Sequence, residues 1–233
     1  MKLLENLLDG FISLFYPQLC LSCGENITPG EDAICISCQV KLPKTGFHLE
    51  KENSFTDRFW GRVNIESGAS FYHFSKEGRV QHLIHNLKYK GRYEVGIKLG
   101  NLYGKVLKKS PLYRNIDVII PVPLHPKKEL KRGYNQSVMF AKGLSETMEV
   151  EWKKNILIST KMSETQTKKS RLERLENVKD VFKINDVDFL KDKHVLIVDD
   201  VLTTGATLEA CTMKILEIPG TKVSLATIAF ANL

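Results

Sequence analysis

The chain has 233 residues, of which 42% are hydrophobic and 26% are charged, and its formal net charge is +7. This length allows one full hydrophobic core plus a small module, and the absence of any run of about 20 apolar residues argues against a membrane-spanning helix. The charge is uneven, because residues 1–60 carry five Lys or Arg and eight Asp or Glu, a net of −3, which leaves +10 for residues 61–233. A basic surface suits a polyanion such as nucleic acid, and it equally suits solubility or a highly charged small ligand.

The first 16 residues contain leucines at helical spacing and end before Pro17. This pattern predicts an amphipathic helix over residues 1–16. We expect the helix to dock on the rest of the protein, with a peripheral foot on the inner face of the membrane as the alternative. Because acidic residues interrupt the run and no small-residue cleavage site follows it, we expect no signal peptide and a cytoplasmic protein.

Four cysteines form two C-x-x-C pairs, Cys20/Cys23 and Cys35/Cys38, with eleven residues between the pairs. Two thiolate pairs at this spacing can complete a tetrahedron around one metal ion. We therefore predict a zinc module over residues 17–43, with a structural Zn²⁺ because all four ligands are cysteine. Two disulfides are the alternative, although nothing in the sequence indicates secretion. Since the module is acidic, we expect it to contact a protein or to brace the larger domain.

Residues 44–62 are polar with scattered aromatic residues, which is typical of a linker, and a larger domain is expected over residues 63–233. The expected strands are residues 65–74, 116–120, 155–160, 195–198 and 222–230, and the expected helices are residues 80–89, 93–108 and 135–148. Strands that alternate with helices predict an α/β fold with a parallel sheet and helices on both faces.

Residues 195–207, VLIVDDVLTTGAT, are the most informative run in the chain. Four apolar residues predict a buried strand, and Asp199 and Asp200 follow at its C-terminal end. A loop of threonines and a glycine then leads into an amphipathic helix. The C-terminal edge of a parallel sheet is where α/β folds bind ligands, and a helix N-terminus behind such a loop attracts anions. Because carboxylates suit hydroxyls or a metal ion and the loop suits a phosphate, the run predicts a sugar-phosphate site; an ordinary strand-to-helix turn is the alternative.

This run resembles the phosphoribosyl pyrophosphate (PRPP) motif of type I phosphoribosyltransferases. In that family the paired acids hold the ribose 2′ and 3′ hydroxyls, and the loop cradles the 5′-phosphate. The resemblance implies a set of PRPP-binding residues: Asp199, Asp200, Thr203, Thr204, Gly205, Ala206 and Thr207. Mg²⁺ is expected to accompany PRPP without a dedicated protein cage, since it prefers phosphate and ribose oxygens.

Two cationic segments follow predicted strands. Residues 119–136 include Arg132 and three lysines, and we expect them to form a loop that holds a pyrophosphate; a solvated basic loop is the alternative. Residues 165–178 are polar and basic, which predicts a mobile lid whose Lys168 and Arg171 cover negative charge; a salt-bridged surface turn is the alternative.

Taken together, these motifs resemble the ComF family. The matching segments are the paired cysteines, Pro121-Val-Pro-Leu-His125, Arg132-Gly-Tyr-Asn-Gln136 and the PRPP run. The resemblance implies a zinc module joined to a type I phosphoribosyltransferase-like domain. It further implies a role in natural transformation, in the uptake and cytoplasmic handling of single-stranded DNA, with the zinc module recruiting a competence helicase.

Two functions remain open at this point. The first is a DNA-handling competence protein that binds PRPP or a related phosphosugar. The second is an active phosphoribosyltransferase, a pentosyl-transferring enzyme, that acts on an unidentified nucleophile. In this second case Asp199 and Asp200 orient the ribose, Arg132 holds the leaving pyrophosphate, and Lys168 or Arg171 stabilises its charge from the lid. A PRPP-sensing regulator without chemistry is a third option.

Overall fold

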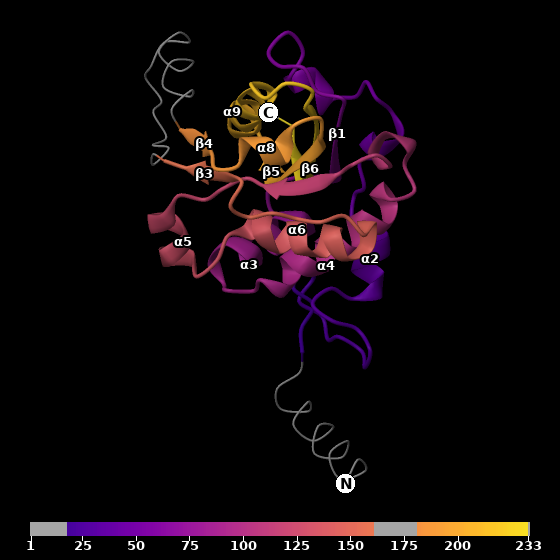
Figure 1. Ribbon diagram of the computed structural model, residues 1–233. Coiled ribbons are helices and arrows are strands. Elements are labelled where there is room, and N and C mark those ends of the chain that lie inside the picture. The colour runs from indigo at the N-terminus through magenta and orange to yellow at the C-terminus, as the bar shows by residue number, and fades with distance from the viewer. Residues whose placement is uncertain (1–17, 161–180, 233) are drawn as a thin grey trace.

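The computed structural model describes residues 18–160 and 181–232 (Figure 1). The expected N-terminal helix over residues 1–16 lies outside the described residues, as does the cationic segment with Lys168 and Arg171. Within the described part of the chain, no helix is both long and apolar enough to cross a membrane.

Four parallel strands form the central sheet in the order β1–β6–β5–β2. Their bounds are Ser67–Phe74 for β1, Val118–Pro121 for β2, His194–Leu202 for β5 and Lys222–Ala231 for β6. Nearly all of their residues are buried, as expected for parallel strands covered on both faces. The parallel sheet predicted from the sequence is therefore present.

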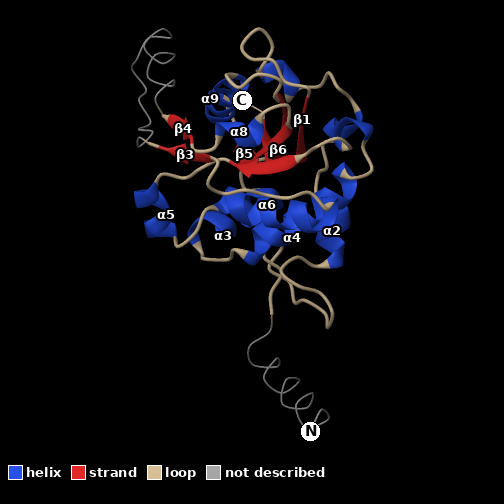
Figure 2. Ribbon diagram, viewed as in Figure 1, coloured by secondary structure: helices blue, strands red, loops and turns tan. Residues whose placement is uncertain are grey.

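Helices cover both faces of this sheet, as Figures 1 and 2 show. On one face lie α3 (Arg79–Tyr89), α4 (Glu94–Leu107) and α6 (Gln136–Met148), and on the other lies α9 (Ala206–Leu216). Side chains of β5 alternate between the two cores: Leu196 packs in the core with α3, α4 and α6, whereas Ile197 packs in the core with α9. The uninterrupted apolar run of this strand thus contributes side chains to the hydrophobic cores on both faces of the sheet.

The helices α4 and α6 are in direct backbone contact. A Cβ added to Gly100 of α4 would lie 2.8 Å from the Cα of Gly143 on α6. Any larger side chain at either position would push the two helices apart. This close approach matters for the site, because the first turn of α6 reaches the C-terminal end of β5.

The strand expected over residues 155–160 is present as β3 (Leu157–Ser159), but it lies outside the parallel sheet. It pairs in an antiparallel manner with β4 (Phe182–Ile184) in a separate two-stranded ribbon, which the short helix α8 (Val187–Leu190) follows. The apolar pattern indicates a strand correctly, whereas the choice of partner depends on residues distant in the chain.

Residues 44–62, expected to be a linker, contain two short 3-10 helices, η1 (Phe47–Leu49) and η2 (Thr56–Arg58). Phe55 and Phe59 of this segment are fully buried in the core on the α9 side of the sheet. The aromatic side chains therefore hold the segment against the domain, despite its polar composition.

Candidate functional site

The acid pair lies at the C-terminal end of β5, where β5, α3 and α6 converge. The strand continues through Asp199 and Asp200, beyond the expected end at residue 198. Asp199 Oδ1 accepts hydrogen bonds from Ser137 Oγ and from the backbone N–H of Asp200, both at 2.8 Å. Asp200 Oδ1 forms an ion pair with Lys88 Nζ of α3 at 2.9 Å. The sequence gives no direct signal for the roles of Ser137 and Lys88.

Asn135 holds the first turn of α6 in this position. Its side-chain oxygen accepts from the N–H of Ser137 at 2.9 Å, which caps the helix. Its side-chain N–H group donates to the carbonyl of Val122, just beyond β2, at 2.9 Å. One buried amide therefore ties α6 to the end of the neighbouring strand and directs Ser137 at Asp199.

The two carboxyl groups are electrostatically unequal. Burial raises the pKa of Asp199 to about 7, and repulsion from the Asp200 carboxylate adds to this increase. The hydrogen bonds from Ser137 and from the Asp200 N–H oppose the increase, as does the charge of Lys88. Near neutral pH, Asp199 is consequently divided between its acid and carboxylate forms, so it can donate to or accept from a ligand hydroxyl.

The loop after β5 has the geometry of an anion site. Gly205, with φ of +83°, precedes α9 as its N-cap, and the exposed side chains of Thr203, Thr204 and Thr207 surround it. Asp199 and the loop residues 201–208 line a small hollow. Because the first N–H groups of a helix have no partner within the helix, they are available to a phosphate. Six of the seven residues expected to bind PRPP thus line this hollow, whereas Asp200 is not among its lining residues and pairs with Lys88.

Arg62 braces this loop from the segment that was expected to be a linker. Its guanidinium donates to the Thr204 carbonyl at 3.3 Å and forms an ion pair with Glu209 in the first turn of α9. The ring of Phe59 lies against Gly205, where an added Cβ would be 3.3 Å from the ring. Sequence reasoning did not assign these contacts because they join residues far apart in the chain.

The basic segment after β2 is a helix rather than the expected loop. It forms α5 (Pro126–Arg132). His125 caps its N-terminus, with Nδ1 accepting from the Lys127 N–H, and Gly133 with φ of +83° caps its C-terminus. Arg132 donates to Gln136 Oε1 at 2.8 Å, and its guanidinium lies 5.6 Å from the centre of the Tyr89 ring. Arg132 therefore lies at the C-terminal end of α3, where Tyr89 directly follows Lys88.

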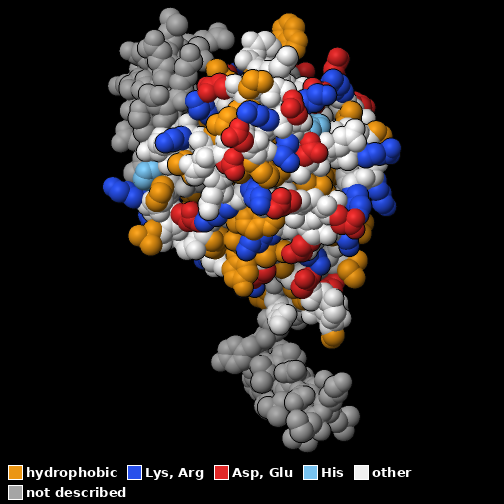
Figure 3. All heavy atoms as spheres, viewed as in Figure 1, with side chains coloured by type: hydrophobic (Ala, Val, Ile, Leu, Met, Phe, Trp, Pro, Cys, Tyr) orange, Lys and Arg blue, Asp and Glu red, His pale blue; other side chains and the backbone are white. Residues whose placement is uncertain are grey.

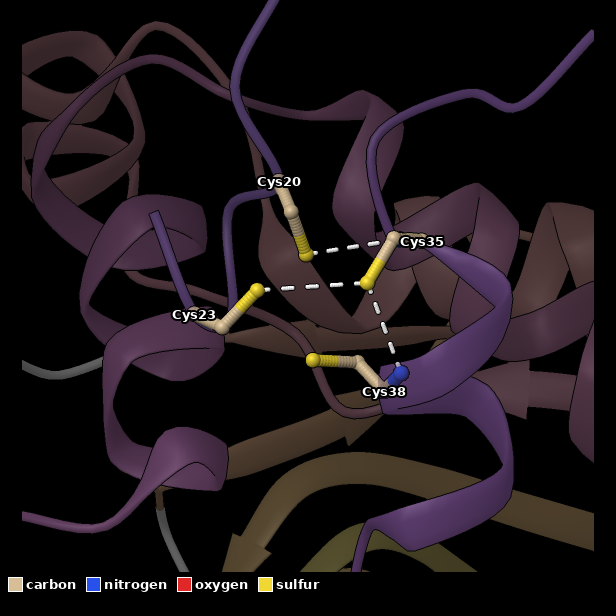
Figure 4. A group of neighbouring side chains, drawn as sticks. All are labelled: Cys20, Cys23, Cys35 and Cys38. Carbon is tan, nitrogen blue, oxygen red and sulfur yellow. Dashed lines mark hydrogen bonds between the residues drawn. The ribbon is translucent and has the colours of Figure 1, made fainter. Parts of the chain in front are cut away.

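The four cysteines Cys20, Cys23, Cys35 and Cys38 point their sulfur atoms toward a common centre (Figure 4). All four sulfurs lie within 4.8 Å of one another, and the Sγ atoms of Cys23 and Cys35 are 3.9 Å apart. A tetrahedral zinc site with Zn–S bonds of about 2.3 Å requires sulfurs about 3.8 Å apart. The predicted ligand set therefore fits Zn²⁺ in both chemistry and spacing.

The surroundings of these thiols shift their pKa values in opposite directions. Although burial opposes ionisation of Cys20, hydrogen bonds from backbone N–H groups, that of Cys35 foremost, outweigh it and lower the pKa of Cys20 to about 7. Burial raises the pKa of Cys38 to about 12, so this thiol needs a metal to displace its proton near neutrality. The helix α2 (Ile36–Lys41) carries Cys38, and the N–H of Cys38 donates to Cys35 Sγ at 3.4 Å.

Comparison with known proteins gives the family. The chain matches the phosphoribosyl transferase domain family over residues 134–232, which contain α6, β5, α9 and β6. DNA utilization protein YhgH of Shigella flexneri is 32% identical over 212 residues, which cover 84% of this chain and 89% of that protein. The chain belongs to the ComF family.

Two further members support this assignment. Competence protein F of Haemophilus influenzae is 24% identical over 208 residues, covering 83% of this chain and 89% of that protein. Competence protein ComFC of Bacillus subtilis is 24% identical over 203 residues, covering 80% and 79% respectively. The resemblance to the ComF family is confirmed, and so is the type I phosphoribosyltransferase fold with a parallel sheet and helices on both faces.

Proposed function

We propose that this ComF-family protein binds PRPP or a related phosphosugar at the end of β5 and uses that site in handling single-stranded DNA during natural transformation. The observation that carries the first part is the position of the acid pair beside the N-terminus of α9. Asp199 and Asp200 suit the ribose hydroxyls, and the loop from Thr203 to Thr207 suits the 5′-phosphate. Mg²⁺ would neutralise pyrophosphate oxygens with few protein ligands.

The end of α3 supports the DNA part of the proposal. Tyr89 is 65% exposed, and the centre of its ring lies 5.2 Å from that of His85 and 5.6 Å from the guanidinium of Arg132. Planar groups on which bases stack, set among cations, are how proteins bind single strands without reading their sequence. The helix α5 and the turn after α3 also carry exposed basic residues: Lys90, Arg92, Lys127 and Lys131.

Charge alone does not identify the DNA surface. In the face drawn in Figure 3, acidic and basic side chains are interspersed rather than gathered into one basic field. The combination of exposed aromatic and cationic groups at the end of α3 is the more specific feature. The names of the relatives, a DNA utilization protein and competence proteins, support a DNA-related role.

We infer that the four-cysteine module contacts a protein partner such as a competence helicase. Ile36 and Val40 are 63% and 70% exposed and stand one turn apart on α2, so they present an apolar strip. The segment up to residue 60 is acidic, which suits a basic partner better than a nucleic acid.

Phosphosugar binding can be tested by calorimetry with PRPP and Mg²⁺. Wild-type protein is expected to bind, and the Asp199→Asn/Asp200→Asn double variant is expected to lose binding. Asp188→Asn is the matched control, because Asp188 is an exposed carboxylate on α8 that pairs with Lys191. Equal binding by wild type and the double variant would contradict the assignment.

DNA binding can be tested with a fluorescent oligothymidine. Tyr89→Ala is expected to weaken DNA binding about fivefold or more, because it removes one stacking contact. Tyr89→Phe retains the ring and should retain the affinity. Binding should also weaken as salt increases, since phosphate contacts release counterions. Equal affinities of Tyr89→Ala and wild type would rule out this surface, and transformation assays of the same variants connect it to the biological role.

The raised pKa of Asp199 favours a second candidate, catalysis of phosphoribosyl transfer. A carboxyl that titrates near neutrality is suited to accept a proton from a nitrogen nucleophile as pyrophosphate leaves the ribose. Pyrophosphate release from PRPP by pure protein, measured across candidate nucleophiles, tests this reaction. Release that is unchanged in Asp199→Asn would contradict a role for this carboxyl.

A further inference from the structure

The turn between Cys20 and Cys23 is hydrogen-bonded to α3, the helix that also reaches the acid pair. Asn86 Nδ2 donates to the carbonyl of Leu21 at 3.1 Å, and His82 Nδ1 lies 3.2 Å from the carbonyl of Ser22. Leu21 and Ser22 are the two residues between Cys20 and Cys23. Their carbonyl positions therefore depend on the turn that two metal ligands would hold.

The same helix delivers Lys88 to the site at the end of β5. Asn86 and Lys88 are separated by about 3 Å along the helix axis, so the two residues move together when the helix moves. Leu83 and Leu87 of α3 are fully buried, which fixes the rotation of the helix about its axis. Any displacement of α3 at the cysteine turn is consequently transmitted to Lys88.

We propose that the four-cysteine site positions α3, and through α3 the Lys88 ammonium group, so that metal loading and phosphosugar binding are coupled. A metal ion bound by Cys20 and Cys23 would close the turn between them and would hold the carbonyls of Leu21 and Ser22 in their contacts with Asn86 and His82. His82 and Asn86 are positioning residues in this scheme. The coupling to the ligand rests on the proposed function, whereas the positioning of α3 does not.

Lys88 matters to a ligand for an electrostatic reason. Its ammonium lies 2.9 Å from Asp200 Oδ1, and both side chains are largely buried. A phosphosugar held by the acid pair would place anionic oxygens within reach of this cation, and charge-assisted hydrogen bonds are the stronger ones. Displacing Lys88 would weaken the binding of the phosphosugar and would leave Asp200 without its counter-ion.

The test uses the full-length, zinc-loaded protein with Asn86→Leu, which preserves the size of the side chain and removes the donor to the Leu21 carbonyl, and with it the bond to the His82 carbonyl within α3. Asp32→Asn is the matched control, because Asp32 of the module pairs with Lys98 of α4 and not with α3. Both variants are expected to retain one zinc per chain by mass spectrometry. Asn86→Leu is expected to weaken PRPP binding about fivefold, the value of one hydrogen bond, while Asp32→Asn matches wild type.

A double-mutant cycle separates positioning from a general structural effect. If Asn86 acts through Lys88, Asn86→Leu adds little further loss of PRPP affinity in a Lys88→Met background. Full additivity of the two losses would overturn the proposal. Unchanged PRPP affinity in Asn86→Leu would overturn it as well.

Hydrogen–deuterium exchange provides a readout that needs no PRPP. The backbone amides at the C-terminal end of α3 are expected to exchange faster in Asn86→Leu than in Asp32→Asn, while those of α9 do not change. Faster exchange without any PRPP binding by wild type would reject the proposed phosphosugar function and preserve the positioning of α3. Identical exchange in the two variants would reject the positioning.

Discussion

Lys88 and Asp200 form an ion pair that joins the last turn of α3 to the C-terminal end of β5, with Nζ and Oδ1 at 2.9 Å. The pair places a cation in direct contact with one of the two carboxylates expected to hold the ribose. The helix α3 therefore contacts both the acid pair and the cysteine module, because it is also hydrogen-bonded to the turn between Cys20 and Cys23.

Replacing Lys88 with Met should weaken PRPP binding by about tenfold, the value of one charge-assisted hydrogen bond. The loss should appear in calorimetry at constant Mg²⁺. Lys90→Met provides the control, since Lys90 follows the same helix and is exposed. A similar loss in both variants would indicate a general effect of charge rather than a contact of Lys88.

Asp199 should make the stability of the protein depend on pH. Its folded-state pKa is raised from 3.8 to about 7, so the folded state binds more protons than the unfolded state between these values. The stabilisation is therefore full below the unfolded pKa and decreases as pH rises, by at most about 1.4 kcal/mol per pH unit, until the folded pKa is passed. Asp199→Asn should remove this slope in denaturant unfolding followed from about pH 5 to about pH 8. An identical slope in wild type and variant would show that Asp199 is ionised throughout.

Gly205→Ala should impair both stability and phosphosugar binding. The positive φ of Gly205 is unfavourable for a side chain, at a cost of about 1 kcal/mol or more, and the Cβ would also meet the ring of Phe59. Gly91→Ala separates the two effects, because Gly91 has φ of +69° with open space around it. Both substitutions should lower the unfolding temperature. Only Gly205→Ala should weaken PRPP binding in calorimetry.

Metal removal should destabilise the cysteine module. Wild-type protein is expected to contain one zinc per chain, and Cys23→Ser should lower the zinc content and the unfolding temperature together. Cys211→Ala is the control, since Cys211 belongs to α9 and is buried in the core rather than in the four-cysteine cluster. It should retain its zinc even though it loses packing in the core. Loss of zinc in this control would argue against the four-cysteine ligand set.

The four strands of the parallel sheet, the helices α3, α4 and α6, the clustering of the four cysteines and the strand–loop–helix arrangement of the PRPP run could be predicted from the sequence. Each depends on residues close together in the chain: hydrophobic period, C-x-x-C spacing, and a strand that leads directly into a loop and a helix. Asp199, Asp200 and Gly205 come together because covalent connectivity places them on one strand end. Asn135, likewise, caps the helix that it immediately precedes.

The partners of those residues were decided only by the tertiary structure. Ser137 and Asp199 are 62 positions apart, and Arg62 and the Thr204 carbonyl are 142 apart. Such contacts arise from the packing of α3, α6 and the segment 44–62 around the sheet. No local sequence pattern indicates which of the many Lys, Arg or Ser residues will contact a given carboxylate. Buried aromatic side chains set the position of that segment, and backbone contact between Gly100 and Gly143 sets the position of α6. The sequence therefore determines the chemical groups of the site, whereas long-range packing determines which cations and hydroxyls surround them.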